Sequence, residues 1–107
     1  MNAILPPVML FKDAKGQLIH WDTEDGMLVP FFAGGFSPQK FILGLGIKEA
    51  IDGWLFDNLP KFVEFLRTII ANPSAFRIAG FVMNPTEPDL RKYQAIPPAD
   101  LLAQLGP

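Results

Sequence analysis

The strongest constraint on the fold of this chain is an amphipathic pattern at residues 59–71. Apolar side chains recur there three and four residues apart, which is the spacing of one buried face of an α-helix. The apolar positions are Leu59, Phe62, Val63, Leu66, Ile69 and Ile70, with Phe65 widening the face. Asp57 or Asn58 is expected to cap the helix, Pro60 suits its first turn, and Asn72-Pro73 stops it. We predict that this helix is the main packing element.

Short apolar runs before and after this helix predict a sheet. Residues 8–11, 17–21 and 27–32 are expected to form three strands joined by polar turns, and residues 76–83 a central strand buried on both faces. Pro30 cannot donate a hydrogen bond to a neighbouring strand, so we expect it at an edge or a bulge. Residues 47–52 are ambiguous, with a preference for an extended segment.

Two further helices are expected outside residues 59–71. Ser37-Pro38 resembles an N-cap followed by a first-turn proline, and Gly44 and Gly46 would end that short helix. Pro97-Pro98-Ala99-Asp100 opens a last helix that ends near Leu105-Gly106. The order of elements predicts a single α+β domain over residues 1–107, with an antiparallel-dominated sheet and three helices packed mainly on one face.

Composition narrows the setting and the classes of partner. The chain has no cysteine, which excludes disulfides, thiolate chemistry and zinc ribbons and suits a reducing cytoplasm. No segment approaches the ~20 apolar residues that cross a bilayer, and the first residues lack the basic start of a secretory signal. We therefore expect a cytoplasmic protein with no membrane partner. A net charge of −2 without a basic run argues against nucleic-acid binding.

The apolar content is high for a small domain. Hydrophobic residues make up 50% of the chain, ten of them Phe, and charged residues 19%. Either the core is unusually aromatic, or part of this material meets a partner. We expect a homodimer, because an edge strand at Pro30 beside Phe31-Phe32 would invite pairing. The alternative is that all ten Phe side chains fit inside one core.

Residues that often carry catalysis lack the partners that catalysis needs. His20, the single histidine, lies in an expected strand between Ile19 and Trp21 and should face solvent. Ser37 is followed by Gln39 where a nucleophile elbow needs glycine, and helix capping explains it. We predict no catalytic residue.

Two further motifs fail on spacing. Residues 44–49 begin like a dinucleotide-binding loop, but Glu49 stands where the third glycine belongs. The acidic turn at residues 22–26 has its glycine fifth rather than sixth, so we expect a solvated hairpin turn instead of a calcium loop. We predict no metal and no cofactor.

Aromatic residues gather around a Gly34-Gly35 hinge, with Trp54, Phe56 and Phe62 not far on. Such a cluster would line a ligand cleft or fill the core of a small domain. The candidate binding residues are Phe31, Phe32, Phe36, Phe41 and Asn84.

Four stretches carry a recognisable pattern. They are an apolar strand with Pro-x-Phe at residues 28–32, a Ser-Pro helix start at 36–40, a strand running into Asn-Pro at 80–85, and a closing helix at 96–102. In these stretches the chain resembles the N-terminal domain of the SseB-type "enhanced serine sensitivity" proteins, over most of residues 27–105. The hinge departs from that family's usual Phe-Thr-Ser. The resemblance implies an α+β fold and a bacterial setting, and it carries no activity onto particular residues.

These features predict a non-enzymatic binding or interaction module with a protein partner. The alternative is a small-molecule-binding protein or weak enzyme that uses the aromatic hinge region. A concave pocket with converging polar groups would favour a ligand, and a flat apolar patch would favour a protein.

Overall fold

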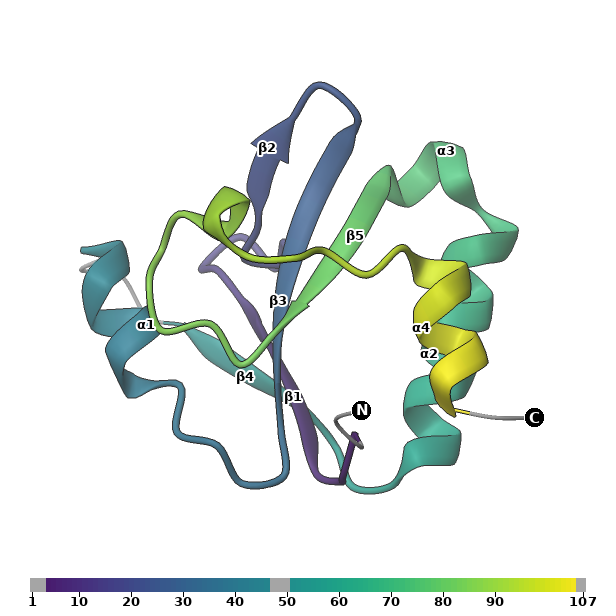
Figure 1. Ribbon diagram of the computed structural model, residues 1–107, viewed down its shortest axis with the longest axis horizontal. Helices are drawn as coiled ribbons and strands as arrows, with labels where there is room; N and C mark the ends of the chain where they lie inside the picture. The colour runs from purple at the N-terminus through teal and green to yellow at the C-terminus, as the bar shows by residue number, and fades with distance from the viewer. Residues whose placement is uncertain (1–3, 47–50, 106–107) are drawn as a thin grey trace.

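The computed structural model describes residues 4–46 and 51–105 (Figure 1). Within these residues the strands are β1 (Val8–Lys12), β2 (Trp21–Thr23), β3 (Gly26–Ala33), β4 (Asp52–Phe56) and β5 (Ile78–Met83). The helices are α1 (Gln39–Leu45), α2 (Leu59–Ala71), α3 (Pro73–Phe76) and α4 (Pro98–Leu105), and η1 (Leu90–Lys92) is a single 3₁₀ turn. The predicted α+β class is confirmed.

Strand β3 is the centre of the five-stranded sheet. It pairs antiparallel with β2 at its start and with β1 at its end, while β5 lies parallel to it (Figure 1). Strand β4 pairs antiparallel with β1. Three of these four pairings are antiparallel, as predicted. The prediction of a central strand at 76–83 is wrong in position, because β5 is paired along its length only with β3 and meets Ile96 through one isolated bridge at Phe81.

The prediction that Pro30 lies at an edge or a bulge is wrong, because β3 pairs with three other strands and its irregular register with β5 lies between Met27 and Leu28. Pro30 is buried within this strand. The carbonyl of Phe31 accepts a hydrogen bond from the N–H of Asn84 just beyond β5. Main-chain groups alternate along a strand, so the nitrogen of Pro30 faces the opposite side. On that side β2 ends its pairing at Leu28 and β1 begins its pairing at Phe32. Pro30 therefore occupies the gap between two partners, where no donor is needed.

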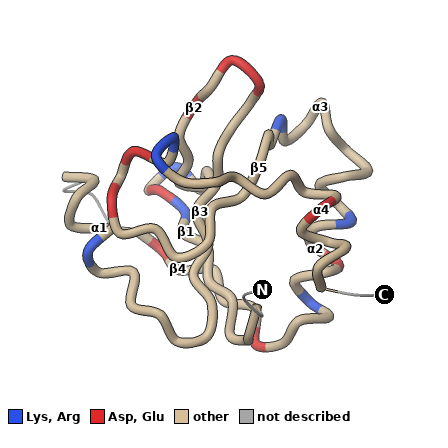
Figure 2. The backbone as a smooth tube through the Cα atoms, in the orientation of Figure 1, with Lys and Arg blue, Asp and Glu red and all other residues tan. Residues whose placement is uncertain are grey.

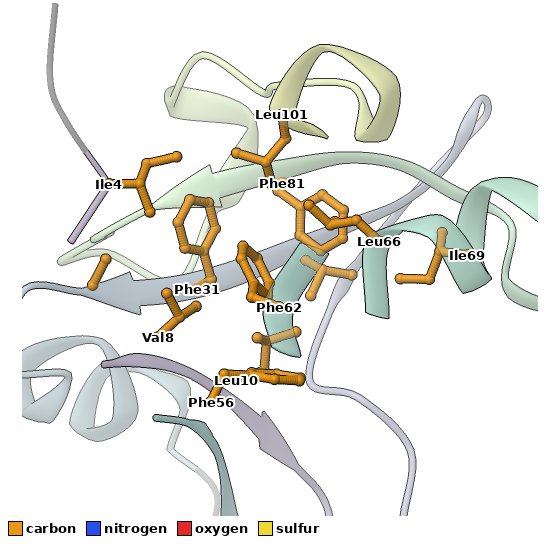
Figure 3. Packing of buried hydrophobic residues seen from close by; sticks show 12 residues of the cluster. Ile4, Val8, Leu10, Phe31, Phe56, Phe62, Leu66, Ile69, Phe81 and Leu101 are labelled. Atoms are coloured by element: carbon orange, nitrogen blue, oxygen red, sulfur yellow. The ribbon is translucent and has the colours of Figure 1, made fainter. Parts of the chain in front are cut away.

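Alternating side chains of β3 and β5 fill a core on each face of the sheet. On one face α2 and α4 cover a cluster in which the rings of Phe31, Phe62 and Phe81 lie together (Figure 3). On the other face the buried side chains include Phe32 and Val82 and pack with Phe41 of α1 and Leu90 of η1. The helices thus pack mainly on one face, as predicted, with α1 on the other.

Helix α2 has the predicted bounds, because its start and its buried face are both encoded locally. The N–H of Lys61 donates to Asn58 Oδ1 at 3.0 Å, and Pro60 lies in the first turn. The buried residues are Phe62, Leu66 and Ile69. Ile70, expected on the buried face, is 38% exposed.

Boundaries elsewhere differ from expectation. The second strand is residues 21–23 rather than 17–21, because a turn at Asp13 and Gly16 returns the chain to β1 through a bridge between Lys12 and Leu18. Helix α1 begins at Gln39. The N–H of Gln39 makes only a long contact of 3.4 Å with the Oγ of Ser37, the residue expected to cap the helix.

The extended segment predicted at residues 47–52 overlaps the start of β4 (Asp52–Phe56). Residues 47–50 lie outside the described residues, and β4 begins at Asp52. The short helix α3 was not expected, and it takes Phe76 out of the predicted strand. None of the described helices is both long and apolar enough to cross a membrane.

Candidate functional site

The candidate binding residues do not converge, because β3 directs its neighbouring side chains to opposite faces. Phe31 lies under α2, with ring centroids 5.8 Å from Phe62 and 6.2 Å from Phe81. Phe32 and Phe41 are buried on the other face, with ring centroids 5.6 Å apart. Phe36 is 40% exposed and stacks on Phe32 at 6.4 Å. The sheet therefore separates Phe31 from the other three rings, and their role in binding stays a prediction.

The fifth candidate, Asn84, holds two strands together. It adopts a left-handed conformation with φ 51°, and its N–H donates to the carbonyl of Phe31 at 2.8 Å. Its side-chain Oδ1 accepts from the N–H of Ala33 at 2.9 Å. Both polar contacts go to β3, so this residue serves the fold at the end of β5.

A groove of about 350 Å³ lies where the segment between β1 and β2 faces α2 and α3. We call it the aromatic groove. Its apolar side chains are Leu18, Met27, Trp54, Phe65 and Phe76, and its polar side chains are Lys12, Gln17 and His20.

Two rings from separate elements make one wall of the aromatic groove. Trp54 comes from β4 and Phe65 from α2, and they meet edge to face with centroids 4.8 Å apart. Trp54 also packs against Phe56 at 5.1 Å, which ties this wall to the core under α2. Both Trp54 and Phe65 are half-buried, so part of each ring faces the groove.

Lys12 brings positive charge to the aromatic groove. Its Nζ lies 4.1 Å from the centroid of the Trp54 ring, a cation–π contact. Among the described residues Lys12 forms no ion pair. Asp52 stands opposite it in the β1–β4 ladder but makes no salt bridge with it.

His20 differs from the expectation of a solvent-facing ring without partners. Its side chain is only 24% exposed, and its Nε2 lies 3.2 Å from Asp22 Oδ1. Its Nδ1 lies 2.7 Å from the carbonyl oxygen of Leu18, and this nitrogen donates because a carbonyl only accepts. Both ring nitrogens therefore face protein oxygens. A general base needs a nitrogen directed at its substrate, and this geometry holds the ring as part of a wall instead.

The acidic turn is the solvated hairpin turn that the sequence predicts. Glu24 and Asp25 form the exposed turn between β2 and β3, and Figure 2 shows these acidic residues at the hairpin tip. The Thr23 hydroxyl donates to the carbonyl of Gly26 at 2.7 Å and closes the turn. In residues 4–46 and 51–105, no three or more His, Asp or Glu side chains gather as a metal site would require.

Two other hollows are less suited to a ligand. One of about 430 Å³ lies between the end of α2 and the start of α4, and its walls include Ile70, Pro73, Pro97 and Pro98 but no aromatic ring. Another, of about 320 Å³, adjoins the aromatic groove and shares Met27, Ala75 and Phe76 with it. The aromatic groove combines ring surfaces with the cationic side chain of Lys12, so we take it as the candidate site.

Sequence reasoning missed most of this site, although a signal for one residue was present. Phe65 widens the apolar face of α2 beyond what the helix needs to contact a sheet, and this excess marks a ring at the border of the core. For Trp54 the sequence gives no signal beyond its place among the aromatic residues near the hinge. Lys12 and His20 carry no local pattern that points to each other.

Comparisons with protein-family models, with curated proteins and with solved structures find no match for this chain. The resemblance to the SseB-type N-terminal domain therefore stays a prediction from the four stretches that carry it. The candidate site rests on its own geometry: a concave aromatic surface with the Lys12 ammonium at its border.

Proposed function

We propose that this chain is a non-enzymatic binding module of a small bacterial cytoplasmic protein resembling the SseB N-terminal domain. The aromatic groove is then where it holds an apolar group of its partner. One observation carries the proposal: the rings of Trp54, Phe65 and Phe76 stand beside a hollow of about 350 Å³ instead of closing over it. That volume falls in the range of roughly 300–1,000 Å³ of ligand sites, which are mostly apolar with a few polar groups.

The polar groups of the groove support binding over chemistry. No Ser, Thr, Asp or Glu is found among the described residues that line the groove. His and Lys can also act in catalysis, but they need a free nitrogen directed at the substrate. Both nitrogens of His20 contact protein oxygens, and the Lys12 ammonium lies over the Trp54 ring.

The groove can be blocked without touching either core. Ala75 lies on α3, is exposed and lines the groove, so Ala75→Phe would fill it. Ala103 on α4 is equally exposed and lies away from the groove, which makes Ala103→Phe the matched control. Partners captured from the native host, together with small molecules retained in native mass spectrometry, should be lost in Ala75→Phe and kept in Ala103→Phe. Equal recovery by both variants would contradict a binding role for the groove.

We also propose that the protein forms a symmetric dimer. The predicted contact between two copies at Pro30, Phe31 and Phe32 is not supported, because these residues are buried. Exposed leucines support self-association instead, with Leu43 72% and Leu55 48% exposed. Sedimentation at micromolar concentration should show a dimer that Leu43→Glu or Leu55→Glu weakens. A monomeric wild-type protein would contradict the dimer.

The alternative of a small-molecule binder or weak enzyme at the hinge has less support. Phe32 and Phe41 contact each other and fill the core under α1. A ligand there would have to displace buried rings, whereas the aromatic groove is already open.

A further inference from the structure

We propose that the aromatic groove binds a small monocarboxylate with an apolar ring or short chain, and that the Lys12 ammonium pairs with its carboxylate. This inference rests on the proposed function of the same groove and adds the chemical class of its ligand. Three observations carry it. The charge at the groove is positive, Lys12 has no ion-pair partner among the described residues, and the hollow is small and mainly apolar.

Among the described residues that line the groove, Lys12 carries the one formal charge at pH 7, and it is positive. Lys12 and His20 both face it, and no acidic side chain is among the described residues that line it. Three acids stand near the groove without lining it. Asp22 Oδ1 lies 3.2 Å from His20 Nε2, and Asp13 Oδ1 accepts from the N–H groups of Lys15 and Gln17. Asp52 is across the ladder from Lys12 and makes no salt bridge with it. A cationic ligand would be repelled by Lys12 and would compete with it for the face of Trp54. An anionic ligand meets neither obstacle.

Lys12 can accept an anion without breaking an existing ion pair. Its ammonium contacts the Trp54 ring at 4.1 Å and has no carboxylate partner in the described part of the chain. A charged hydrogen bond to a carboxylate is stronger than one between neutral groups, and it gains further where the site is partly dry. Lys12 is half-buried and sits at the border of an apolar floor, which meets that condition.

The dimensions of the groove suit one small apolar group and not a whole helix. Its volume of about 350 Å³ accommodates one ring or a short acyl chain against Leu18, Phe65 and Phe76. A partner helix has a diameter of about 10–12 Å and needs a long open channel. Residues of α3 and of the turn at Gly16 are part of the lining of the groove.

Three probes that share a phenyl ring on a three-carbon chain and differ in the charge of their end group test the proposal: 3-phenylpropanoate, 3-phenylpropanamide and 3-phenylpropan-1-amine. The chain has two tryptophans, so a Trp21→Phe background leaves Trp54 as the sole indole reporter of the groove. Fluorescence titration should show the carboxylate binding about tenfold more tightly than the amine, the scale of one charged hydrogen bond, with the amide between them.

Two lysine variants assign the preference to its residue. Lys12→Met keeps an unbranched side chain over Trp54 and removes the charge, so the affinity for the carboxylate should fall to that for the amide. Lys15→Met, in the exposed turn and outside the groove lining, should leave all three affinities unchanged.

The outcomes separate the ligand class from the function. An amine that binds as tightly as the carboxylate, a carboxylate preference that survives Lys12→Met, or no saturable binding of any probe at millimolar concentration would overturn the monocarboxylate proposal. The proposed function fails on a different result, namely when Ala75→Phe and Ala103→Phe recover the same partners.

Discussion

The side-chain Oδ1 of Asn84 accepts a hydrogen bond from the main-chain N–H of Ala33 at 2.9 Å. Strand β5 ends at Met83, and a continued parallel ladder would offer Ala33 the main-chain carbonyl of residue 84. Asn84 leaves the extended conformation with φ 51°, and its side-chain carbonyl takes that place. Asparagine tolerates this left-handed conformation better than most residues. One residue thus ends β5 and satisfies the last donor of β3.

Two substitutions at Asn84 separate its hydrogen bond from its backbone conformation. Asn84→Gly removes the acceptor but allows the left-handed conformation, so its cost should be that of an unpaired, part-buried N–H, about 1–3 kcal/mol. Asn84→Ala adds the strain of a Cβ at positive φ, roughly 1–2 kcal/mol more. Urea denaturation measures both free energies of unfolding. An alanine variant at least as stable as the glycine variant would show that the conformation carries no strain.

Helix α2 offers a matched pair of truncations. Leu66 is fully buried in the core under α2, and Glu64 is exposed on the opposite side of the same helix. Leu66→Ala should cost on the order of 2–5 kcal/mol through the cavity that it leaves. Glu64→Ala should cost under about 0.5 kcal/mol, as most surface changes do. Equal denaturation midpoints for the two variants would mean that α2 presents another face to the sheet.

Gly26 is the position least able to accept a side chain at the start of β3. Its φ is +133°, and a Cβ there would lie 2.4 Å from the main-chain oxygen of Arg77. Gly16 is the control, because its φ of +82° is also positive but no atom lies within 4 Å of its added Cβ. Gly16→Ala should cost roughly 1–2 kcal/mol from backbone strain alone. Gly26→Ala should cost more, because the carbonyl that pairs with Met27 must also move. A smaller loss in Gly26→Ala than in Gly16→Ala would contradict the close approach of β3 to Arg77.

The fold could be predicted where its causes are local. The cap at Asn58, the first-turn proline and the spacing of Phe62, Leu66 and Ile69 all lie within residues 58–71, and α2 has the predicted bounds. Pro30 shows the opposite case. The sequence shows that Pro30 has no N–H to donate. Whether its nitrogen faces a partner depends on where β2 and β1 pair with β3, at Leu28 and at Phe32, and the whole sheet sets these pairings.

The site was harder to predict than the fold because its residues come from separate elements. Lys12 ends β1, Trp54 lies in β4 and Phe65 in α2, and the sheet brings them together only after all three have formed. The hinge phenylalanines, by contrast, were adjacent in sequence, and strand alternation sends Phe31 and Phe32 to different cores. In a turn, residues that are adjacent in sequence can share a site. In a strand, adjacent side chains point to opposite faces of the sheet, so they do not.

Tyr93 is fastened by the loop that follows β5. Its hydroxyl oxygen accepts hydrogen bonds from the main-chain N–H groups of Thr86 at 2.9 Å and Glu87 at 3.0 Å, and it lies 3.2 Å from Thr86 Oγ1. The Thr86 side-chain hydrogen bond is the largest cause that lowers the pKa of Tyr93 below its ordinary value of 10.0. Burial opposes it, the main-chain N–H groups of Thr86 and Glu87 lower the pKa further, and the charge of Glu87 raises it slightly. Donors directed at the oxygen favour the phenolate.

The lowered pKa of Tyr93 makes a prediction with a definite sign. Because the folded state holds the phenolate better than the unfolded state, the contribution to stability is present above the unfolded pKa and is lost as pH falls through the folded pKa. Tyr93 is the only tyrosine of the chain, so the phenolate absorbance reports it alone. The native protein should titrate at lower pH than the same protein in urea, with circular dichroism confirming that it stays folded. Thr86→Val, which keeps the shape and removes the hydroxyl, should move the native midpoint up toward the unfolded one. A native midpoint at or above the unfolded value would show that the loop does not direct its donors at the Tyr93 oxygen.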